Sequence, residues 1–408
     1  KEHIMTEKLL IIDGSSLLST SFYATATAYL MAKTDEDKEK ALTRLMKTSD
    51  GRYTNGVFPF MRTLLSLIKK NQPTHLAVVW DVSRQTFRQE IAGGTYKGTR
   101  KATPHPLKEQ FISTQNLLQG IVPQFLSGKD DEEVYEADDF AGSLAKRFQN
   151  EIPVFLHTKD EDYLQLVDTN TRVWLGSSKA DKMFEDLGLN RQEFNVPDGF
   201  FEFTLSTLKD IKGLEPYQIV EYKALCGDTS DNIPGVKGVG EKAVIPLLQE
   251  YGNIESIYDT IENLSSKEEK ELKKFFKESL GIGRSPISYM LAEGVIALSS
   301  GEKINYNVIF DEVTEEDKAL QPLFEEKLGK LRFPIRLSNA EDIEKLRNEE
   351  VYGVQLCAKE SAFMSKELAT IKTDIESIAN VNLDDIKLNI NYDELKARLL
   401  DFEIKTLI

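Results

Sequence analysis

Acidic side chains follow three short apolar runs of the chain, in positions where they could bind metal ions. Asp13, Asp81 and Asp160 end these runs, and Asp162 follows two residues later. Each run is typical of a buried parallel strand: KLLIID (8–13), THLAVVWD (74–81) and IPVFLHTKDED (152–162). Open parallel sheets bind ligands at the carboxyl ends of their strands, so we expect these acids to meet. For any one of them, a turn or helix N-cap role is the alternative.

Two further acidic groups precede predicted helices. EADD supplies Glu136, Asp138 and Asp139, and GDTSD supplies Asp228 and Asp231. Compensation of the helix dipole and helix capping are the alternative explanations for them. If all nine carboxylates converge, cations must offset their repulsion. Ligands that are all oxygen select Mg²⁺ or Mn²⁺, and nine acids exceed the needs of one ion. Two ions can activate water and stabilise a leaving oxygen in phosphodiester hydrolysis.

Positive charge gathers in one segment of a chain whose net charge is −16. Residues 84–108 contain one acid, Glu90, and six basic residues: Arg84, Arg88, Lys97, Arg100, Lys101 and Lys108. Tyr96 precedes Lys97, a pairing that can stack on a base beside a phosphate contact. The alternative is an ordinary solvated loop.

A glycine loop follows Asp231, in the sequence NIPGVKGVGEK (232–242). Gly235, Gly238 and Gly240 permit positive φ and close backbone approach, and N–H groups at a helix start attract phosphate. With helices predicted on both sides, the loop resembles a helix–hairpin–helix element. Such contacts fix the register of a duplex without reading its sequence.

The intervening segments predict the scaffold that positions these residues. Helical patterns at 57–70, 107–122 and 137–150 alternate with the strands, and a fourth strand is expected at 172–176. This order predicts an α/β domain with a doubly wound, mostly parallel sheet. After about residue 205 the strand signals fade and helices are predicted. The length of 408 residues favours two to three domains.

Segments from residue 8 to the last residue resemble the 5′→3′ exonuclease and flap endonuclease family, most closely the N-terminal nuclease domain of bacterial DNA polymerase I. They occur in the family's order: LLIIDGSSLL, TNGVFPF, VVWD with FRQE, YKGTRKATP, EADDFAG, TKDEDYLQLV, GDTSDNIPGVKGVGEKA, SKELATIKTD and FEIKTLI. The resemblance implies a PIN-like nuclease core with a helical arch, followed by a mainly helical DNA-binding region.

The resemblance also implies roles for single residues. The first metal set would be Asp13, Asp81, Glu136 and Asp138, the second Asp160, Asp162, Asp228 and Asp231, with Asp139 between them. Lys97 and Arg100 would lie at the base of the arch, with Lys97 stabilising charge on the scissile phosphate and Tyr96 stacking on the terminal base. A helix–three-turn–helix element would grip the duplex and hold K⁺ through backbone carbonyls. The implied DNA contacts are Arg84, Arg88, Tyr96, Lys97, Arg100, Lys101, Gly235, Val236, Lys237, Gly238, Val239, Gly240 and Lys242.

The chain departs from the family by an added stretch of roughly ninety residues, a length typical of a small domain. We therefore expect three parts: a nuclease core at 5–205, a helical DNA-binding region at 206–264 and 358–408, and an insert of unknown role at 265–357. An extra DNA-binding surface, a partner-docking site and a plain scaffold are the alternatives for this insert. Its mixed charge and the lack of a clear basic footprint favour the scaffold.

Together these features predict a metal-dependent, structure-specific 5′ nuclease of DNA replication and repair, acting as a 5′→3′ exonuclease and flap endonuclease. Its partners would be DNA with a 5′ flap, nick or free 5′ end, and a DNA polymerase or other replication protein. We expect a cytoplasmic monomer, since there is no membrane-spanning run and only two distant cysteines. The segment KEHI before Met5 resembles a remnant of a cloning tag.

Two other classes of function were weighed. A non-catalytic module that binds flaps or junctions predicts gaps in the acidic set, and the sequence has none. A phosphomonoesterase with Asp13 as nucleophile commonly has a second aspartate two residues on, where this chain has Ser15. Cleavage of an RNA strand by a related α/β nuclease stays open.

Overall fold

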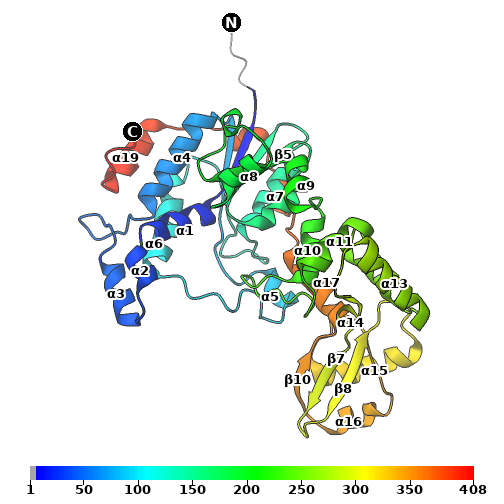
Figure 1. Ribbon diagram of the computed structural model, residues 1–408. Helices are drawn as coiled ribbons and strands as arrows, with labels where there is room; N and C mark the ends of the chain where they lie inside the picture. The colour runs from blue at the N-terminus through cyan, green and yellow to red at the C-terminus, as the bar shows by residue number, and fades with distance from the viewer. Residues whose placement is uncertain (1–5) are drawn as a thin grey trace. The chain divides into compact units, whose positions relative to one another are not determined.

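The computed structural model describes residues 6–408, so the tag-like segment before Met5 lies outside the described residues. The chain forms two compact units (Figure 1). Unit 1 comprises the residues up to Phe87 together with Lys101–Tyr217 and Ile371–Ile408. Unit 2 comprises Arg88–Arg100 and Gln218–Thr370.

Unit 1 is built on a six-stranded sheet in the order β3-β2-β1-β4-β5-β6. All neighbours pair in parallel except β6, which is antiparallel to β5. The mostly parallel α/β fold predicted from the sequence is therefore confirmed. The strands are β1 (Leu9–Asp13), β2 (His75–Val79), β3 (Gln124–Phe125), β4 (Val154–Thr158), β5 (Thr171–Gly176) and β6 (Phe200–Phe203).

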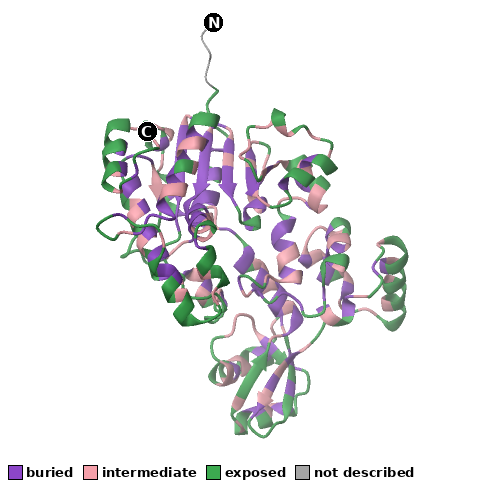
Figure 2. Ribbon diagram, turned by 60° about the vertical axis from the view of Figure 1, so that its left-hand side comes forward, coloured by how far each residue is buried: buried purple, intermediate pink, exposed green. Residues whose placement is uncertain are grey.

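Helices enclose this sheet, which is why its central strands read as continuous apolar runs. Every residue of β1 and β2 is buried, and Figure 2 shows the buried strands between helices with exposed outer faces. The helix α7 packs on β1, β2 and β4, while one core cluster joins Leu10 and Ile12 to residues of α1, α4, α6 and α19. The larger helices are α1 (Gly14–Ala24), α4 (Val57–Asn71), α6 (His105–Leu118), α7 (Ala137–Phe148) and α19 (Tyr392–Asp401).

Shorter elements complete unit 1. They are α2 (Thr27–Met31), α3 (Asp35–Thr43), η1 (Glu161–Leu166), α8 (Ala180–Asp186), η2 (Arg191–Glu193), α9 (Leu205–Lys212), α18 (Glu376–Ala379) and η3 (Leu383–Ile386). The short helix α5 (Phe87–Ile91) begins at the boundary between the two units. Among residues 6–408, no helix combines the length and apolar character needed to span a membrane.

Unit 2 combines a helical part with a small antiparallel sheet in the order β10-β7-β8-β9. The helices are α10 (Gln218–Cys226), α11 (Glu241–Tyr251), α12 (Ile254–Ile261), α13 (Ser266–Ser279), α14 (Ile287–Met290) and α17 (Ala358–Ala369). The sheet and its two helices are β7 (Gly294–Leu298), β8 (Lys303–Val308), α15 (Glu315–Leu328), β9 (Ile335–Leu337), α16 (Asp342–Asn348) and β10 (Val351–Gln355).

The compact units divide the chain differently from the predicted domains. Residues 371–408 belong to unit 1, where Leu395, Leu399 and Ile404 lie in the main core cluster. Residues 88–100 instead pack within unit 2. Within the insert, the part from β7 to β10 surrounds a hydrophobic core that includes Ile296, Ile304 and Phe324.

Gly14 connects the end of β1 to α1 at a point where the packing leaves no room for a side chain. A Cβ added there would lie 2.7 Å from Cγ1 of Val78 and 2.9 Å from two ring atoms of Trp80. Trp80 is fully buried, so its rigid indole cannot move without disturbing the segment that leads to Asp81.

We therefore predict that Gly14→Ala lowers the free energy of unfolding by about 1–3 kcal/mol, the usual cost of overpacking a core. Urea denaturation of the purified variant measures this change. Gly283→Ala is the control, because an added Cβ there meets no atom within 4 Å. Equal stability of Gly14→Ala and wild type would contradict the packing argument.

Candidate metal centre and nucleic-acid interface

Unit 1 gathers acidic side chains at the carboxyl edge of its sheet. Asp13 is the last residue of β1 and is buried, with 5% of its surface exposed. Its Oδ1 accepts a hydrogen bond from the amide of Ser16 at 2.9 Å, and its Oδ2 accepts one from Oγ1 of Thr158 at 2.8 Å. Since Thr158 ends β4, these bonds fix the Asp13 carboxylate between two strand ends.

Asp81 lies two residues beyond β2 and contacts the start of α7. Its Oδ1 accepts a hydrogen bond from the amide of Ala137 at 2.8 Å, and its own amide donates to Oγ of Ser15 at 2.7 Å. Asp81 therefore joins the start of α1 to the start of α7. Ser15 and Thr158 escaped the sequence analysis, although each is a small polar residue close to a strand end that carries an acid.

The first turn of α7 adds three carboxylates. One oxygen from each of Glu136, Asp138 and Asp139 lies within 4.8 Å of the others. Asp139 is fully buried and accepts from the amides of Glu136 at 3.0 Å and Lys372 at 2.9 Å. Both of its oxygens therefore accept hydrogen bonds from backbone amides, so Asp139 caps the helix and also binds the C-terminal segment of unit 1.

The segment after β4 brings Asp160 and Asp162 to the same edge. The amide of Asp160 donates to Oγ1 of Thr158 at 3.0 Å, and the amide of Asp162 donates to Oδ1 of Asp160 at 2.9 Å. Thr158 therefore holds both Asp13 and the backbone of Asp160. Glu161, between the two acids, points elsewhere and forms an ion pair with Lys212 at 2.8 Å.

Crowding of negative charge shows in the titration of Asp13. Burial, then the charge of Asp81 and more weakly that of Asp160, raise its pKa from 3.8 to about 7, against the opposing hydrogen bonds from Ser16 and Thr158. A nearby cation would lower this pKa and favour the ionised carboxylate.

A buried tyrosine gives a second sign that this acidic edge suits a polar ligand. Tyr163 in η1 is 1% exposed, and its hydroxyl has no hydrogen-bond partner within residues 6–408. Burial and then the charges of Asp13, Asp138, Asp160 and Asp81 raise its pKa further above 10. An orphaned hydroxyl beside a set of oxygen ligands fits a hydrated divalent cation, so this edge of unit 1 suits a metal.

The remaining two predicted ligands, Asp228 and Asp231, lie in unit 2. Asp228 accepts from Nζ of Lys223 at 2.7 Å and from the amide and hydroxyl of Ser230 at 2.8 and 2.7 Å. Although burial raises the pKa of Asp228, Lys223 and Ser230 lower it to about 2. Asp231 is buried, forms an ion pair with Arg100, and lies 4.0 Å from Nζ of Lys97. Both acids are therefore neutralised by cations of their own unit.

Two residues of the basic segment differ from expectation. Arg88, expected to contact DNA, is 1% exposed, and its guanidinium donates to the carbonyls of Leu368 and Thr370 at 3.0 and 2.9 Å. Tyr96, expected to stack on a base, is 3% exposed within an apolar cluster that includes Ala92 and Met364. Both side chains stabilise unit 2, and we remove them from the DNA-contacting set.

The other basic residues are closer to the surface. The backbone of Lys97 has φ of 53°, and its amide donates to the carbonyl of Asp231 at 2.8 Å. Arg84 is exposed and donates to the carbonyl of Lys101 at 2.6 Å. In place of a helical arch, the structure has only the short helix α5 between β2 and α6 in this stretch.

The glycine loop of unit 2 leads directly into α11, with Gly240 as the N-cap. Gly235 has φ of 61°, and its amide and carbonyl bond to the hydroxyls of Ser365 and Ser361 at 2.9 and 2.5 Å. Val236 and Val239 are buried, so their side chains anchor the loop and cannot form its outer surface. Of the loop residues predicted to contact DNA, Lys237, Gly238, Gly240 and Lys242 are exposed.

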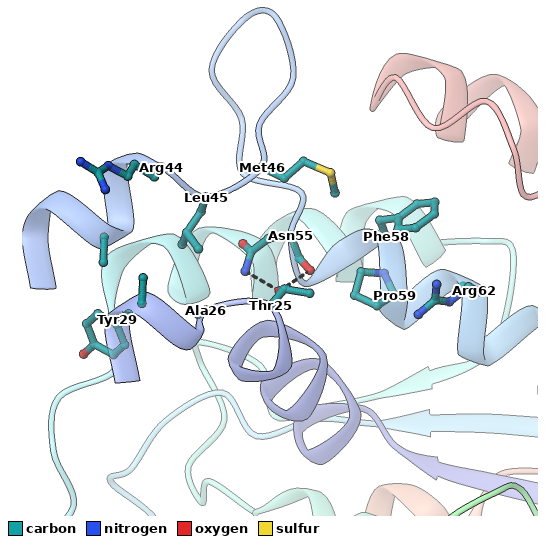
Figure 3. Close-up of a pocket in the computed structure, with 12 residues that line it drawn as sticks. Thr25, Ala26, Tyr29, Arg44, Leu45, Met46, Asn55, Phe58, Pro59 and Arg62 are labelled. Atoms are coloured by element: carbon teal, nitrogen blue, oxygen red, sulfur yellow. Dashed lines mark hydrogen bonds between the residues drawn. The ribbon is translucent and has the colours of Figure 1, made fainter. Parts of the chain in front are cut away.

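A hollow of about 420 Å³ in unit 1 lies between α1, α2, α3 and α4 (Figure 3). Thr25 and Asn55 form its floor and hydrogen bond to each other, and Arg44 and Arg62 flank it. None of the nine predicted carboxylate ligands lines it. The chemistry suggested by the acids therefore belongs to the sheet edge and not to this hollow.

Comparison with known proteins matches both parts of the chain to one family. Residues 8–193 match "5'-3' exonuclease, N-terminal resolvase-like domain", and residues 214–284 match "5'-3' exonuclease, C-terminal SAM fold". A 5'-3' exonuclease of Halalkalibacterium halodurans is 35% identical over 269 residues, which cover 65% of this chain and 77% of that protein.

DNA polymerase I of Lactococcus lactis is 36% identical over 269 residues, but these cover 65% of this chain and 26% of the polymerase. The chain thus matches about a quarter of the length of that relative. Among solved structures, the T5 D15 protein co-crystallised with metal ions is 22% identical, with a TM-score of 0.44, over 67% of this chain and 86% of that one. On the strength of the two matched regions and the H. halodurans relative, the chain belongs to the 5′-3′ exonuclease family.

Proposed function

We propose that the chain is a metal-dependent 5′ nuclease that hydrolyses DNA phosphodiesters, both as a 5′→3′ exonuclease and as a 5′-flap endonuclease. The observation that carries this proposal is the meeting of acids from three strand ends and α7 at one edge of the unit 1 sheet. Family membership and a sheet edge that suits a metal point to the same chemistry. A non-catalytic binding module would have no use for so crowded a set of carboxylates.

We propose Mg²⁺, or Mn²⁺, as the cofactor, with two ions in the working enzyme. The unit 1 residues that would hold metal are Asp13, Asp81, Glu136, Asp138, Asp160 and Asp162. Bound divalent ions would supply an activated water and stabilisation of the leaving oxygen. In unit 2, Asp228 and Asp231 would serve as ligands by exchanging their present lysine and arginine partners for a cation.

Contacts to DNA are proposed for both basic elements. Lys97 and Arg100 would meet the phosphate that is cut, with Lys101 and Arg84 supporting the strand. The glycine loop would hold the duplex backbone through exposed Lys237, Gly238, Gly240 and Lys242, and K⁺ at its carbonyls would strengthen that contact. Such contacts position DNA without reading its sequence, as a structure-specific nuclease requires.

The cellular setting follows from the same reasoning. We propose action in DNA replication and repair as a monomer, on 5′ flaps, nicks and free 5′ ends, alongside a DNA polymerase or another replication protein. The cytoplasm suits the free thiols of Cys226 and Cys357. Incubation with a 5′-labelled flap duplex, with and without Mg²⁺, tests the function directly. The proposal expects cleavage products only with the metal, and intact DNA in both reactions would contradict it.

Replacing a metal ligand should stop cleavage while DNA binding persists. Asp81→Asn and Asp138→Asn each remove one charge from the acidic edge, and we expect the single-turnover rate to fall at least about 10²-fold. Binding of the flap duplex, followed by fluorescence anisotropy, should remain measurable.

The matched control for these variants is Glu161→Gln, which removes an equal charge from the same region. Glu161 forms an ion pair with Lys212 instead of joining the acidic edge, so its variant should cleave normally. Loss of binding equal to loss of cleavage in both aspartate variants would show that the acids are structural.

Replacing Lys97 should lower the rate of cleavage more than the affinity for DNA. We expect Lys97→Ala to slow single-turnover cleavage by about 10²-fold, because it removes a charge that would stabilise the phosphate in the transition state. Lys101→Ala, which removes a neighbouring exposed charge, should weaken binding slightly and leave the rate unchanged. A wild-type rate in Lys97→Ala would remove Lys97 from the site.

The pKa of Asp13 predicts how metal-free protein responds to pH. Because its folded pKa is about 7 and its ordinary value is 3.8, the folded state binds more protons between these values. Stability should therefore fall as pH rises from about 4 to 7, with an Asp13 contribution of up to about 4 kcal/mol.

Urea denaturation in EDTA across this pH range measures that slope, which Asp13→Asn should reduce and Mg²⁺ should oppose in wild type. The same slope in Asp13→Asn and wild type would show that Asp13 does not titrate in this way.

A further inference from the structure

A tyrosine from the insert packs directly against the glycine loop. Tyr289 in α14 approaches Gly238 so closely that an added Cβ at Gly238 would lie 2.3 Å from its Cδ1 and 2.5 Å from its Cε1. Gly238 also has φ of 86°, which favours glycine in its own right. The ring of Tyr289 therefore covers one side of the loop that enters α11.

An exposed arginine stacks on that tyrosine. The guanidinium carbon of Arg284 lies 4.7 Å from the centroid of the Tyr289 ring, within the range of a cation–π contact. Arg284 is exposed, and it follows a short segment in which Ile282 is buried between the exposed Gly281 and Gly283. Stacking limits the motion of the guanidinium and holds it beside the loop.

Arg284 differs from the other five arginines of unit 2 in having no partner for its charge. Arg100, Arg332, Arg336 and Arg347 form ion pairs with carboxylates, and Arg88 donates to buried carbonyls. No ion pair or hydrogen bond of the Arg284 side chain is found within the part of the chain that the structure describes. A cation left open in a protein of net charge −16 is suited to an anion supplied from outside.

The neighbouring lysines of the glycine loop also lack an ion-pair partner among the described residues. Lys237 and Lys242 are exposed, and neither forms an ion pair within residues 6–408. Through Tyr289, Arg284 is fixed next to the same loop, and its planar fork of donors matches the oxygens of a phosphate.

We propose that Arg284, supported by Tyr289, adds a phosphate contact to the glycine loop, so that the start of the insert enlarges the surface that holds the DNA duplex. This inference rests on the proposed nuclease function, in which the loop binds the duplex backbone. Tyr289 lies beyond residues 214–284, the range that matches the family, so the added support comes from this chain's own insert.

The test compares duplex DNA binding by the full chain across a series of KCl concentrations, with fluorescence anisotropy and with Ca²⁺ in place of Mg²⁺ to limit cleavage. A lost phosphate contact lowers the slope of log K against log salt concentration by about 0.9. We expect Arg284→Gln to lower the slope by about that amount and to weaken binding about tenfold at 0.1 M salt. Tyr289→Leu should give a smaller loss of affinity, because Arg284 remains but loses its support.

Two further variants separate the possible failures. Arg347→Gln removes an exposed arginine from α16 in the same unit and should match wild type. Lys237→Ala tests the loop itself and should also reduce the slope. If Lys237→Ala weakens binding while Arg284→Gln keeps the wild-type slope and affinity, the inference about Arg284 is overturned and the proposed function stands. If wild type shows no salt-dependent duplex binding, the proposed DNA contact of the loop is itself wrong.

Discussion

Repulsion between carboxylates brought together at one sheet edge is the constraint on which this structure depends. One acid lies at or just beyond the end of each of the strands β1, β2 and β4, at the same edge of the sheet. The start of α7 adds more acids there. The cost of this repulsion appears in the pKa of Asp13, which burial and the charge of Asp81 raise. Hydrogen bonds from Ser16 and Thr158 hold its carboxylate in place. A divalent cation would remove that cost, so in our proposal metal binding and stability of the acidic edge are coupled.

Hydrogen bonds from the surrounding backbone and side chains fix the positions of these acids. Backbone amides donate to Asp13, Asp81 and Asp160, and the hydroxyl of Thr158 also donates to Asp13. In unit 2, Lys223 and Arg100 form ion pairs with Asp228 and Asp231.

Sequence reasoning succeeded where burial leaves a continuous pattern. The strands β1, β2, β4 and β5 were predicted because parallel strands enclosed by helices are apolar along their length. The strand β8 escaped notice because one of its faces is exposed, so polar residues interrupt the run KINYNV. The strand β7 was overlooked although its sequence, GVIAL, is apolar throughout. The short strand β6 (Phe200–Phe203) was missed as well.

Side-chain roles were harder to predict than strands, because residue type alone does not give direction. Arg88 and Tyr96 are residue types that often contact DNA, yet both are buried among residues far away in sequence. Asp139 belongs to the acidic group, but its carboxylate accepts hydrogen bonds from backbone amides. The sequence gives no sign that the hydroxyl of Tyr163 lies near four acids without a hydrogen-bond partner among the described residues. Such roles depend on long-range packing that only a structure supplies.

The most direct test of the central claim is an equilibrium titration with Mn²⁺, in which electron paramagnetic resonance reports the free ion. Wild-type protein should bind Mn²⁺ without DNA, and a double variant, Asp13→Asn with Asp81→Asn, should lose at least one bound ion per chain while remaining folded by circular dichroism. Equal binding by wild type and the double variant would show that the acidic edge of unit 1 is not a metal site.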